Sequence, residues 1–232
     1  MRSTPARTPR PTAIAVDCGR IDYERALALQ HDLVARREAD EIGDVLLVCE
    51  HEPVYTAGRH ADTAAHVLGT TGIPVVRVDR GGDMTYHGPG QVVIYPIIRL
   101  AGPRRVRAYV TALEQACIAV AAGHGIAART DDRRPGIWVS GDKLAAIGVR
   151  VQRGATSHGL AFNVDPDMDH FAGIVPCGIH DAGVCSLASL GVTATVDGVA
   201  RRLISALAAT LDRDVSRWTT LAALNLPSGR AA

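Results

Sequence analysis

The order of strand-like runs and helical stripes along the chain is the feature that most constrains the fold. A hairpin is predicted in "GIWVSGDKLAAIGVRV" (136–151), turning at Ser140–Gly141–Asp142. Because the strands cluster in the middle of the chain, a single α/β (α+β) domain with a mixed sheet flanked by helices is favoured over a strictly alternating doubly wound fold. Apolar runs typical of strands occur at 12–17, 44–50, 74–79, 91–99 and 157–165.

Three apolar stripes with helical spacing accompany these runs. The first begins at Tyr23, with Asp22 as its expected N-cap. The second runs through 106–120, and the third through 196–211. We expect one folded domain over 12–220, because the ends of the chain are polar and rich in Pro, Gly or Arg without an apolar pattern. These ends, 1–11 and 221–232, are expected to be flexible tails.

Composition narrows the class of protein. A formal net charge of +1 argues against a dominant nucleic-acid or membrane surface. The basic, proline-broken N-terminus lacks an apolar run of signal-peptide length, and no segment approaches the roughly 20 apolar residues of a membrane helix. We therefore expect a cytoplasmic protein that binds neither nucleic acid nor membranes.

Lys143, in the predicted hairpin, is the only lysine in the chain, beside 24 arginines. Arg cannot lose its proton in a protein, whereas a buried Lys can. A single Lys is therefore compatible with an amine that must sometimes be neutral, although a chance Lys on a hairpin remains an alternative.

The segment "RGGDMTYHGPGQ" (80–91) places four glycines and a proline between two predicted strands. Such a segment is costly unless the backbone must approach something closely, so we expect a substrate cradle in which Arg80 and His87 provide polar groups. A tight turn is the alternative. Neither this segment nor "GIWVSGDKL" has the pattern of a nucleotide-binding loop.

The segment "IVPCGIHDAGVCSL" (174–187) follows, and Pro176 and Gly178 in it could present the thiol of Cys177 to a substrate. An ammonium about 4 Å from this thiol could stabilise its thiolate by up to ~4 kcal/mol before desolvation losses. That would give Lys143 a role beside Cys177. A buried inert thiol and a metal site formed by Cys177, His180 and Cys185 are the alternatives.

Taken together, the pieces "RGGDMTYHGPGQVVIYPI", "GIWV", "KLAAIGVRV", "HGLAFNV" and "PCGI...SL" resemble the lipoyl(octanoyl) transferases, which are related to lipoate- and biotin-protein ligases. The resemblance covers about 12–215 and implies the ligase catalytic fold. It also implies transfer of an octanoyl group from acyl carrier protein to a lysine of a lipoyl domain, either in the E2 subunits of 2-oxoacid dehydrogenases or in the glycine cleavage H protein. Cys185 departs from the Thr or Ser of many family members.

The resemblance further implies that Cys177 carries the acyl group as a thioester and that Lys143 assists proton transfer, without a cofactor or metal, in a protein expected to be monomeric. Residues implied to bind the substrate are Arg80, Gly81, Gly82, Asp83, Met84, Thr85, Tyr86, His87, Ala146, Ile147, Gly148, Gly159, Leu160 and Ala161.

Three other functions remain open at this stage. An ATP-dependent lipoate- or biotin-protein ligase would share the fold but would not need a nucleophilic Cys. A cysteine hydrolase would pair Cys177 with His158 or His180 and release free acid. A non-catalytic module would bind lipoyl domains and keep its function in Cys177→Ala.

Overall fold

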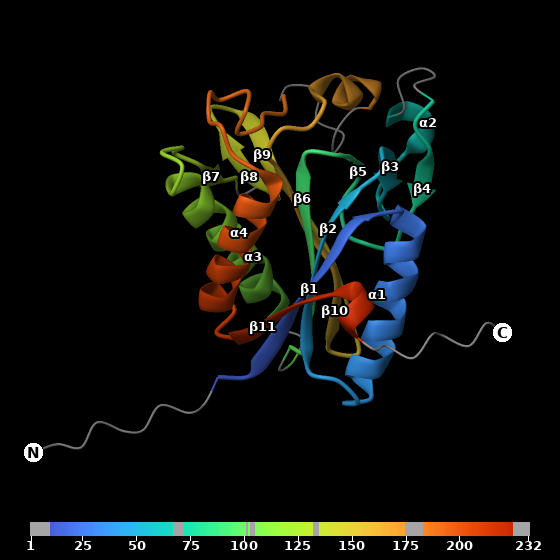
Figure 1. Ribbon diagram of the computed structural model, residues 1–232. Coiled ribbons are helices and arrows are strands. Elements are labelled where there is room, and N and C mark those ends of the chain that lie inside the picture. The colour runs from blue at the N-terminus through green and yellow to red at the C-terminus, as the bar shows by residue number, and fades with distance from the viewer. Residues whose placement is uncertain are drawn as a thin grey trace, which may run out of the picture.

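The computed structural model describes residues 10–66, 72–100, 102, 105–131, 135–174 and 183–224. Its main element is an eight-stranded sheet in the order β11-β1-β2-β6-β10-β9-β8-β7 (Figure 1). The strands are β1 (Thr12–Ile21), β2 (Asp44–His51), β6 (Gln91–Ile97), β7 (Arg129–Thr130), β8 (Ile137–Val139), β9 (Asp142–Gln152), β10 (Ala155–Asn163) and β11 (Asp214–Thr220).

Strand direction makes this sheet mixed. β1 runs parallel to both β11 and β2, whereas β2, β6, β10, β9, β8 and β7 pair with one another in antiparallel fashion. The predicted mixed sheet of a single α/β domain is thus confirmed. A second sheet has three strands in the order β4-β3-β5. Its members are β3 (Val54–Ala57), β4 (Val75–Arg77) and β5 (Met84–His87).

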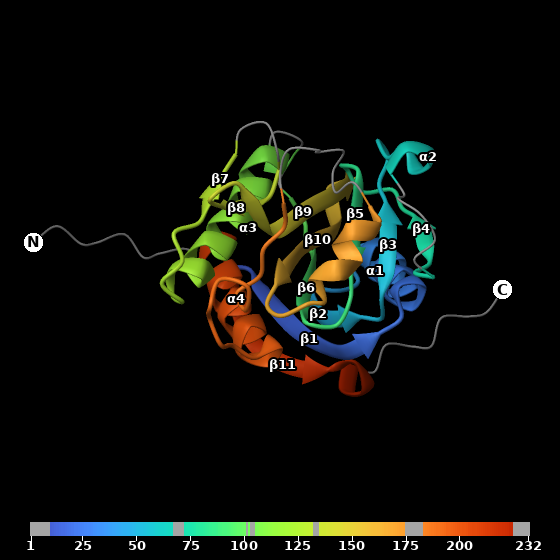
Figure 2. The same cartoon turned by 90° about the horizontal axis from the view of Figure 1, so that it is seen from above.

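Helices cover both faces of the large sheet (Figures 1 and 2). Helices α3 (Arg105–Ala122) and α4 (Val196–Thr210) pack on one face and α1 (Tyr23–Glu38) on the other; α2 (Thr63–His66) lies beside the small sheet. Side chains of β2 point alternately to the two faces of the sheet. Leu46 and Val48 pack in the core with α3 and α4, whereas Val45 and Leu47 pack in the core with α1. Burial on both faces explains why these strands read as continuous apolar runs.

A buried carboxylate, that of Asp44, forms hydrogen bonds with three other segments of the chain. Asp44, at the start of β2, accepts hydrogen bonds from Arg37 Nε (2.8 Å), Arg213 Nε (2.7 Å) and the backbone N–H of Arg99 (3.1 Å). These partners belong to the end of α1 and to the segments that adjoin β11 and β6. Because every donor comes from a different segment, the network fixes the relative positions of these segments in addition to neutralising the carboxylate.

Local sequence signals position several elements as predicted. The Asp22 side chain caps α1 by accepting from the backbone N–H of Arg25. The hairpin turns between β8 and β9, where Ser140 and Gly141 both adopt positive φ, at 52° and 104°. Cys49 and Cys117 are buried in the strand and helix cores, as expected.

The structure also differs from the sequence predictions. Residues 84–87, expected to belong to a loop, form strand β5, and β3, β7 and β11 were not predicted. Residues 221–224 form a 3₁₀ helix within the range expected to be a flexible tail. The strand within 74–79 is shorter than expected, covering Val75–Arg77. Strands β3, β4, β5 and β7 have only two to four residues each, too few to show a periodicity of their own.

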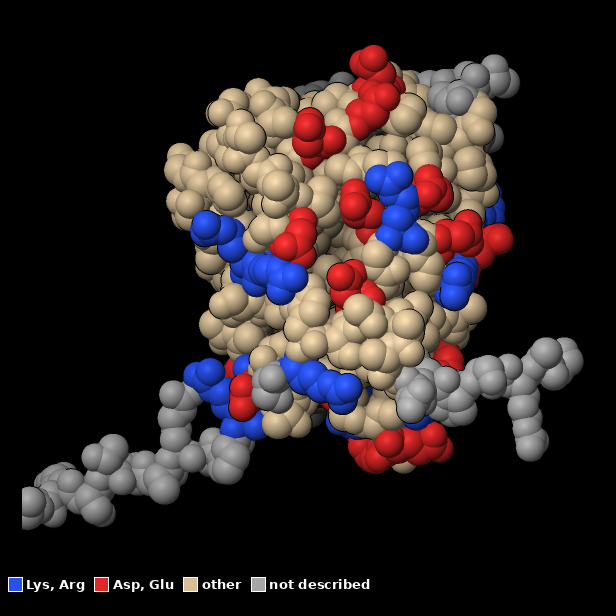
Figure 3. Space-filling model, in the orientation of Figure 1, with Lys and Arg blue, Asp and Glu red and all other residues tan. Residues whose placement is uncertain are grey.

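No helix in the described part of the chain is long and apolar enough to span a membrane. On the face shown in Figure 3, acidic and basic side chains are intermingled. This distribution matches the small net charge of the sequence.

Candidate active site

A cavity of about 450 Å³ lies between strands β9 and β10 and the segment 80–87 that precedes and includes β5. Thirteen of the fourteen residues predicted to bind the substrate line it, as does Lys143. Five segments distant in sequence complete the wall. The lining residues that were not predicted are Tyr23, His60, Tyr95, Val110, Pro135, Val149 and His158.

Tyr86 is the predicted pocket residue that does not line the cavity. Tyr86 packs against Phe171, in an apolar cluster that also contains the cavity-lining Met84. Its hydroxyl lies 2.8 Å from Nδ1 of His170 in the 3₁₀ helix Met168–Gly173. These contacts join Tyr86 of the small sheet to the 3₁₀ helix.

Small residues in register form the part of the wall contributed by β9 and β10. Ala146 pairs with Ala161 and Gly148 pairs with Gly159 across the two antiparallel strands. Paired small side chains leave a trough above the sheet that can receive an unbranched acyl chain. At Gly159 the backbone itself requires glycine, because a Cβ would lie 2.1 Å from the carbonyl oxygen of Ile94.

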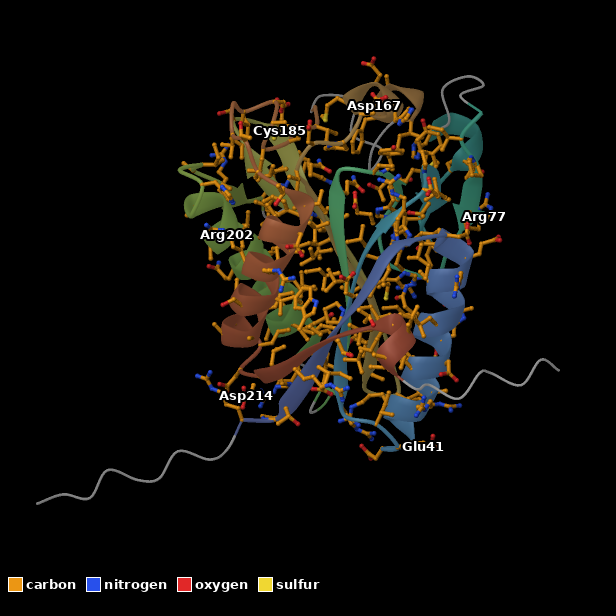
Figure 4. All side chains as sticks on the ribbon, in the orientation of Figure 1. Glu41, Arg77, Asp167, Cys185, Arg202 and Asp214 are labelled. Atoms are coloured by element: carbon orange, nitrogen blue, oxygen red, sulfur yellow. The ribbon has the colours of Figure 1, made fainter. Side chains whose placement is uncertain are left out.

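Lys143 lies at the start of β9 with its side chain buried and its Nζ 4.7 Å from the centroid of the Trp138 ring. Its backbone pairs with the segment that follows the predicted nucleophile: the Lys143 N–H donates to the Gly183 carbonyl, and the Cys185 N–H donates to the Lys143 carbonyl, both at 3.0 Å. Figure 4 shows Cys185 at the same end of the molecule as Asp167. Cys177 itself lies outside the described residues, as do Pro176, Gly178 and His180.

The four cysteines that the structure describes are poorly suited to nucleophilic chemistry. Burial raises the pKa of Cys18 and of Cys185 to about 12, and it raises the pKa values of Cys49 and Cys117 as well. A thiol with a raised pKa is protonated at neutral pH and reacts slowly. The backbone of Cys185 is hydrogen-bonded to that of Lys143, but Cys185 belongs to the apolar core.

A cluster of aromatic and imidazole rings, which the sequence did not reveal, adjoins the cavity. His51 lies with its Nδ1 2.8 Å from the Ile21 carbonyl and its Nε2 2.7 Å from the Tyr95 hydroxyl. The carbonyl can only accept, so Nδ1 carries the proton and Nε2 accepts from Tyr95. Burial lowers the pKa of His51 to about 4. The Tyr23 ring stacks on that of His87, with 5.8 Å between centroids.

The part of the cavity lined by β10 residue His158 is polar. His158 has φ of 56°, and its Nε2 donates to Asp79 Oδ1 at 2.8 Å. Its backbone N–H donates to Gln30 Oε1 of α1, also at 2.8 Å. The buried Arg80 guanidinium donates to the carbonyl and hydroxyl of Thr56 in β3. These bonds join the small sheet and α1 to the walls of the cavity.

Among the described residues, no group of three or more His, Cys, Asp or Glu side chains is placed to hold a metal ion. His180 and Cys177 of the metal-site alternative lie outside this part of the chain. Cys185, its third member, is buried in the apolar core.

Comparison with known structures and families defines the class of protein. Residues 22–208 match the family model of the lipoyl protein ligase A/B catalytic domain. The fold is similar to that of the bi-partite lipoate protein ligase of Thermoplasma acidophilum (TM-score 0.71, 16% identity, covering 90% of this chain and 87% of that one). It is also similar to lipoate-protein ligase A bound with ATP (TM-score 0.69, 16% identity, covering 91% and 89%). The chain therefore belongs to the lipoyl protein ligase A/B catalytic domain family.

Curated relatives place it more closely. The octanoyltransferase of Mycobacterium tuberculosis (strain H37Rv) is 50% identical over 198 residues, covering 84% of this chain and 85% of the relative. The octanoyltransferase of Mycobacterium leprae (strain TN) is 47% identical over 227 residues, covering 94% of each. Within its family the chain is thus one of the octanoyltransferases, which are acyltransferases. The resemblance inferred from the sequence motifs is confirmed.

Proposed function

We propose that the protein transfers an octanoyl group from octanoyl-acyl carrier protein to the acceptor lysine of lipoyl domains, in lipoate biosynthesis. The acyl group is carried as a thioester on Cys177, and Lys143 moves the protons. The observation that carries the proposal is the position of the single lysine, buried in the wall of a cavity whose other walls hold the predicted acyl-binding residues.

The state of the other thiols supports Cys177 as the nucleophile. Each of the four described cysteines has a raised pKa, so none of them is a thiolate at neutral pH. The fifth, Cys177, precedes the Gly183–Cys185 segment, which pairs with the backbone of Lys143. A nucleophilic Cys needs a neighbouring cation to populate its thiolate, and Lys143 is the charged group of the cavity closest in the fold to this segment.

The proton balance explains why a lysine serves better than an arginine. The Cys177 thiolate attacks the thioester carbonyl, and the carrier leaves as a thiol after taking a proton from the Lys143 ammonium. The neutral Lys143 then accepts a proton from the acceptor amine as that amine attacks the acyl-enzyme. The new amide leaves, and the thiolate–ammonium pair is restored. Arg would supply the charge but could not become neutral.

The acceptor is proposed on chemical grounds. A thioester is already activated, so an amide product requires no ATP. A protein-bound lysine with a pKa near ~10.4 is almost fully protonated at pH 7, so the enzyme must favour its neutral form. The E2 subunits of 2-oxoacid dehydrogenases and the glycine cleavage H protein present such lysines on lipoyl domains, and we propose both as acceptors.

Intact mass measurement tests this function directly. Incubated with octanoyl-acyl carrier protein and no ATP, the protein should gain the mass of one octanoyl group, and hydroxylamine should remove it. Cys177→Ser should not be labelled, whereas Cys185→Ser should be labelled like the unsubstituted protein. Label on Cys185 would overturn the assignment of the nucleophile.

The same reaction separates the alternatives. A requirement for ATP and free octanoate would indicate a ligase, and release of free octanoate in place of amide would indicate a hydrolase. Undiminished function of Cys177→Ala would indicate a binding module. Each outcome would replace the proposed function.

A further inference from the structure

A chain of buried side-chain hydrogen bonds leads from the backbone beside Lys143 to His87. Asn163, at the end of β10, lies with Nδ2 2.9 Å from the Cys185 carbonyl and 3.5 Å from the Lys143 carbonyl. Its Oδ1 is 2.9 Å from Nε2 of Gln91, the first residue of β6. Gln91 Oε1 is 3.3 Å from Nδ1 of His87, the last residue of β5. Three adjacent strand ends are thereby linked.

The direction of every bond in this chain is determined by the carbonyls at its start. A backbone carbonyl can only accept, so the Asn163 atom facing Cys185 and Lys143 must be the amide nitrogen. Oδ1 of Asn163 therefore faces Gln91 and accepts from Nε2, which also donates to the Tyr86 carbonyl at 3.2 Å. That leaves Gln91 Oε1 as an acceptor for His87, so Nδ1 of His87 must carry the hydrogen.

His87 is held in one protonation state. Burial, together with the nearby positive charge of Arg80 and the His51 ring, lowers the pKa of His87 well below its ordinary value, so the imidazole is neutral. With the hydrogen on Nδ1, Nε2 has a lone pair. In the described part of the chain Nε2 has no hydrogen-bond partner. It is also not one of the fully buried side-chain nitrogen and oxygen atoms that lack a partner, so it keeps some accessible surface. His87 lines the cavity.

We propose that Gln91 and Asn163 are positioning residues that hold His87 with Nε2 as a hydrogen-bond acceptor on the cavity wall, where it receives an N–H of the acceptor lysine. This inference rests on the proposed function and assigns the step in which His87 acts. It belongs to the second half of the reaction, when the amine approaches the acyl-enzyme.

The chemistry of the substrates indicates that the acceptor amine is the group that donates to Nε2 of His87. An octanoyl chain is apolar, and a thioester group offers only acceptors, so neither can use another acceptor in the wall. The attacking amine carries N–H groups and must be oriented with its lone pair toward the carbonyl. An acceptor for one N–H supplies that orientation. The arm through which the acyl carrier protein holds the octanoyl group is the other source of N–H groups, because it contains amides. Those amides would bind Nε2 of His87 in the first half-reaction.

Separate measurement of the two half-reactions tests the proposal. Gln91→Met removes both amide contacts at similar volume and frees the ring to exchange tautomers. Formation of the octanoyl-enzyme should stay within about threefold of the unsubstituted protein, while single-turnover amide formation on a lipoyl domain should fall by roughly 10- to 100-fold. A fall confined to octanoyl-enzyme formation would assign His87 to the carrier arm and overturn the proposal.

Gln91→Glu adds a readout that lost packing cannot produce. The groups facing the His87 ring are Tyr23 from α1, His51 from β2, Arg80 and His158 from β10. A carboxylate added at Gln91 would favour the imidazolium, whose Nε2 is a donor. Amide formation should then decline as the pH falls through the raised pKa of His87 and recover at higher pH. An unchanged pH profile in a folded variant would contradict the inference.

A direct spectroscopic measurement does not depend on activity. Nitrogen-15 spectra of histidine-labelled protein distinguish the two neutral tautomers, and nine histidines make assignment by substitution practical. His87 should show hydrogen on Nδ1 in the unsubstituted protein and lose that preference in Gln91→Met. Hydrogen on Nε2 in the unsubstituted protein would overturn the proposal, whatever the outcome for the octanoyl-enzyme. Gln30→Met is the matched control, since Gln30 is also buried but does not belong to the chain.

Discussion

Lys143 shows how much a single residue type can imply. It is the only lysine of the chain, and it is buried beside Trp138 with both of its backbone groups bonded to the 183–185 segment. A surface hairpin residue would need none of these contacts. The position places the only lysine side chain of the sequence in the cavity wall.

Substitution of Lys143 should separate its two proposed duties. Lys143→Arg keeps the positive charge, so alkylation of Cys177 at neutral pH should remain faster than in Lys143→Ala. Arg cannot become neutral, so octanoyl transfer to a lipoyl domain should still fall by roughly 10²-fold or more. The two half-reactions are compared in single-turnover experiments on each variant. Transfer by Lys143→Ala near the level of the unsubstituted protein would show that the amine has no role.

At the scale of elements, the pairing of β9 with β10 creates the trough that we propose to hold the acyl chain. Cross-strand pairs of small residues occur twice in succession, Ala146 with Ala161 and Gly148 with Gly159. A shift of one residue in register would turn these positions to the other face of the sheet. The register therefore positions the trough relative to Lys143, three residues before Ala146 on the same strand.

Filling the trough should change the preferred chain length. Ala146→Leu inserts a branched side chain into the wall, so transfer from an octanoyl thioester should fall by about tenfold or more, since overpacking costs about 1–3 kcal/mol. Transfer from a butanoyl thioester should change little, and the ratio of the two kcat/KM values measures the effect. Ala119→Leu, on the exposed side of α3, is the control. Equal losses with both donors would place Ala146 outside the acyl site.

At the scale of the whole molecule, folding buries three imidazole rings at or beside the cavity. His51, His87 and His158 are all buried where the two sheets and α1 meet, and burial lowers the pKa of each. An unfolded chain binds protons on these rings at an ordinary pKa of about 6.5. Folding is thus linked to pH through the interior of the site itself.

Stability should decline in acid for this reason. The pKa of His51 falls from 6.5 in the unfolded chain to about 4 in the folded protein, so its contribution is present above pH 6.5 and is lost as the pH falls toward 4. From pH 7 to pH 5 this ring alone should remove about 2 kcal/mol from the free energy of unfolding. Denaturant titrations at both pH values should show a smaller loss in His51→Gln than in the unsubstituted protein. An identical loss in both would mean that His51 does not titrate differently on folding.

Local patterns in the sequence were sufficient for the longer helices, the central strands and the family. Apolar periodicity located the three long helices and the central strands, because each repeats over enough residues to be recognised without its neighbours. The motifs identified the family, and the residues predicted from them, with Lys143, make up 14 of the 21 residues that line the cavity. Two strands of the small sheet, β3 and β5, were not predicted, because each has only four residues and depends on pairing with its neighbours.

Tertiary structure alone decided which distant residues meet. Tyr23 lies outside the quoted motifs, and Tyr95 and His158 lie inside them but were not among the residues predicted to bind the substrate. Strand order and register bring all three to the cavity. The same register places Gln91 opposite Asn163, and only then does the tautomer of His87 become determined. Tyr86, within the most distinctive motif, packs against His170 and Phe171 and does not line the cavity. The physical reason is that a motif shows which chemical groups are present, whereas long-range strand pairing determines which way they point and which groups they bond to.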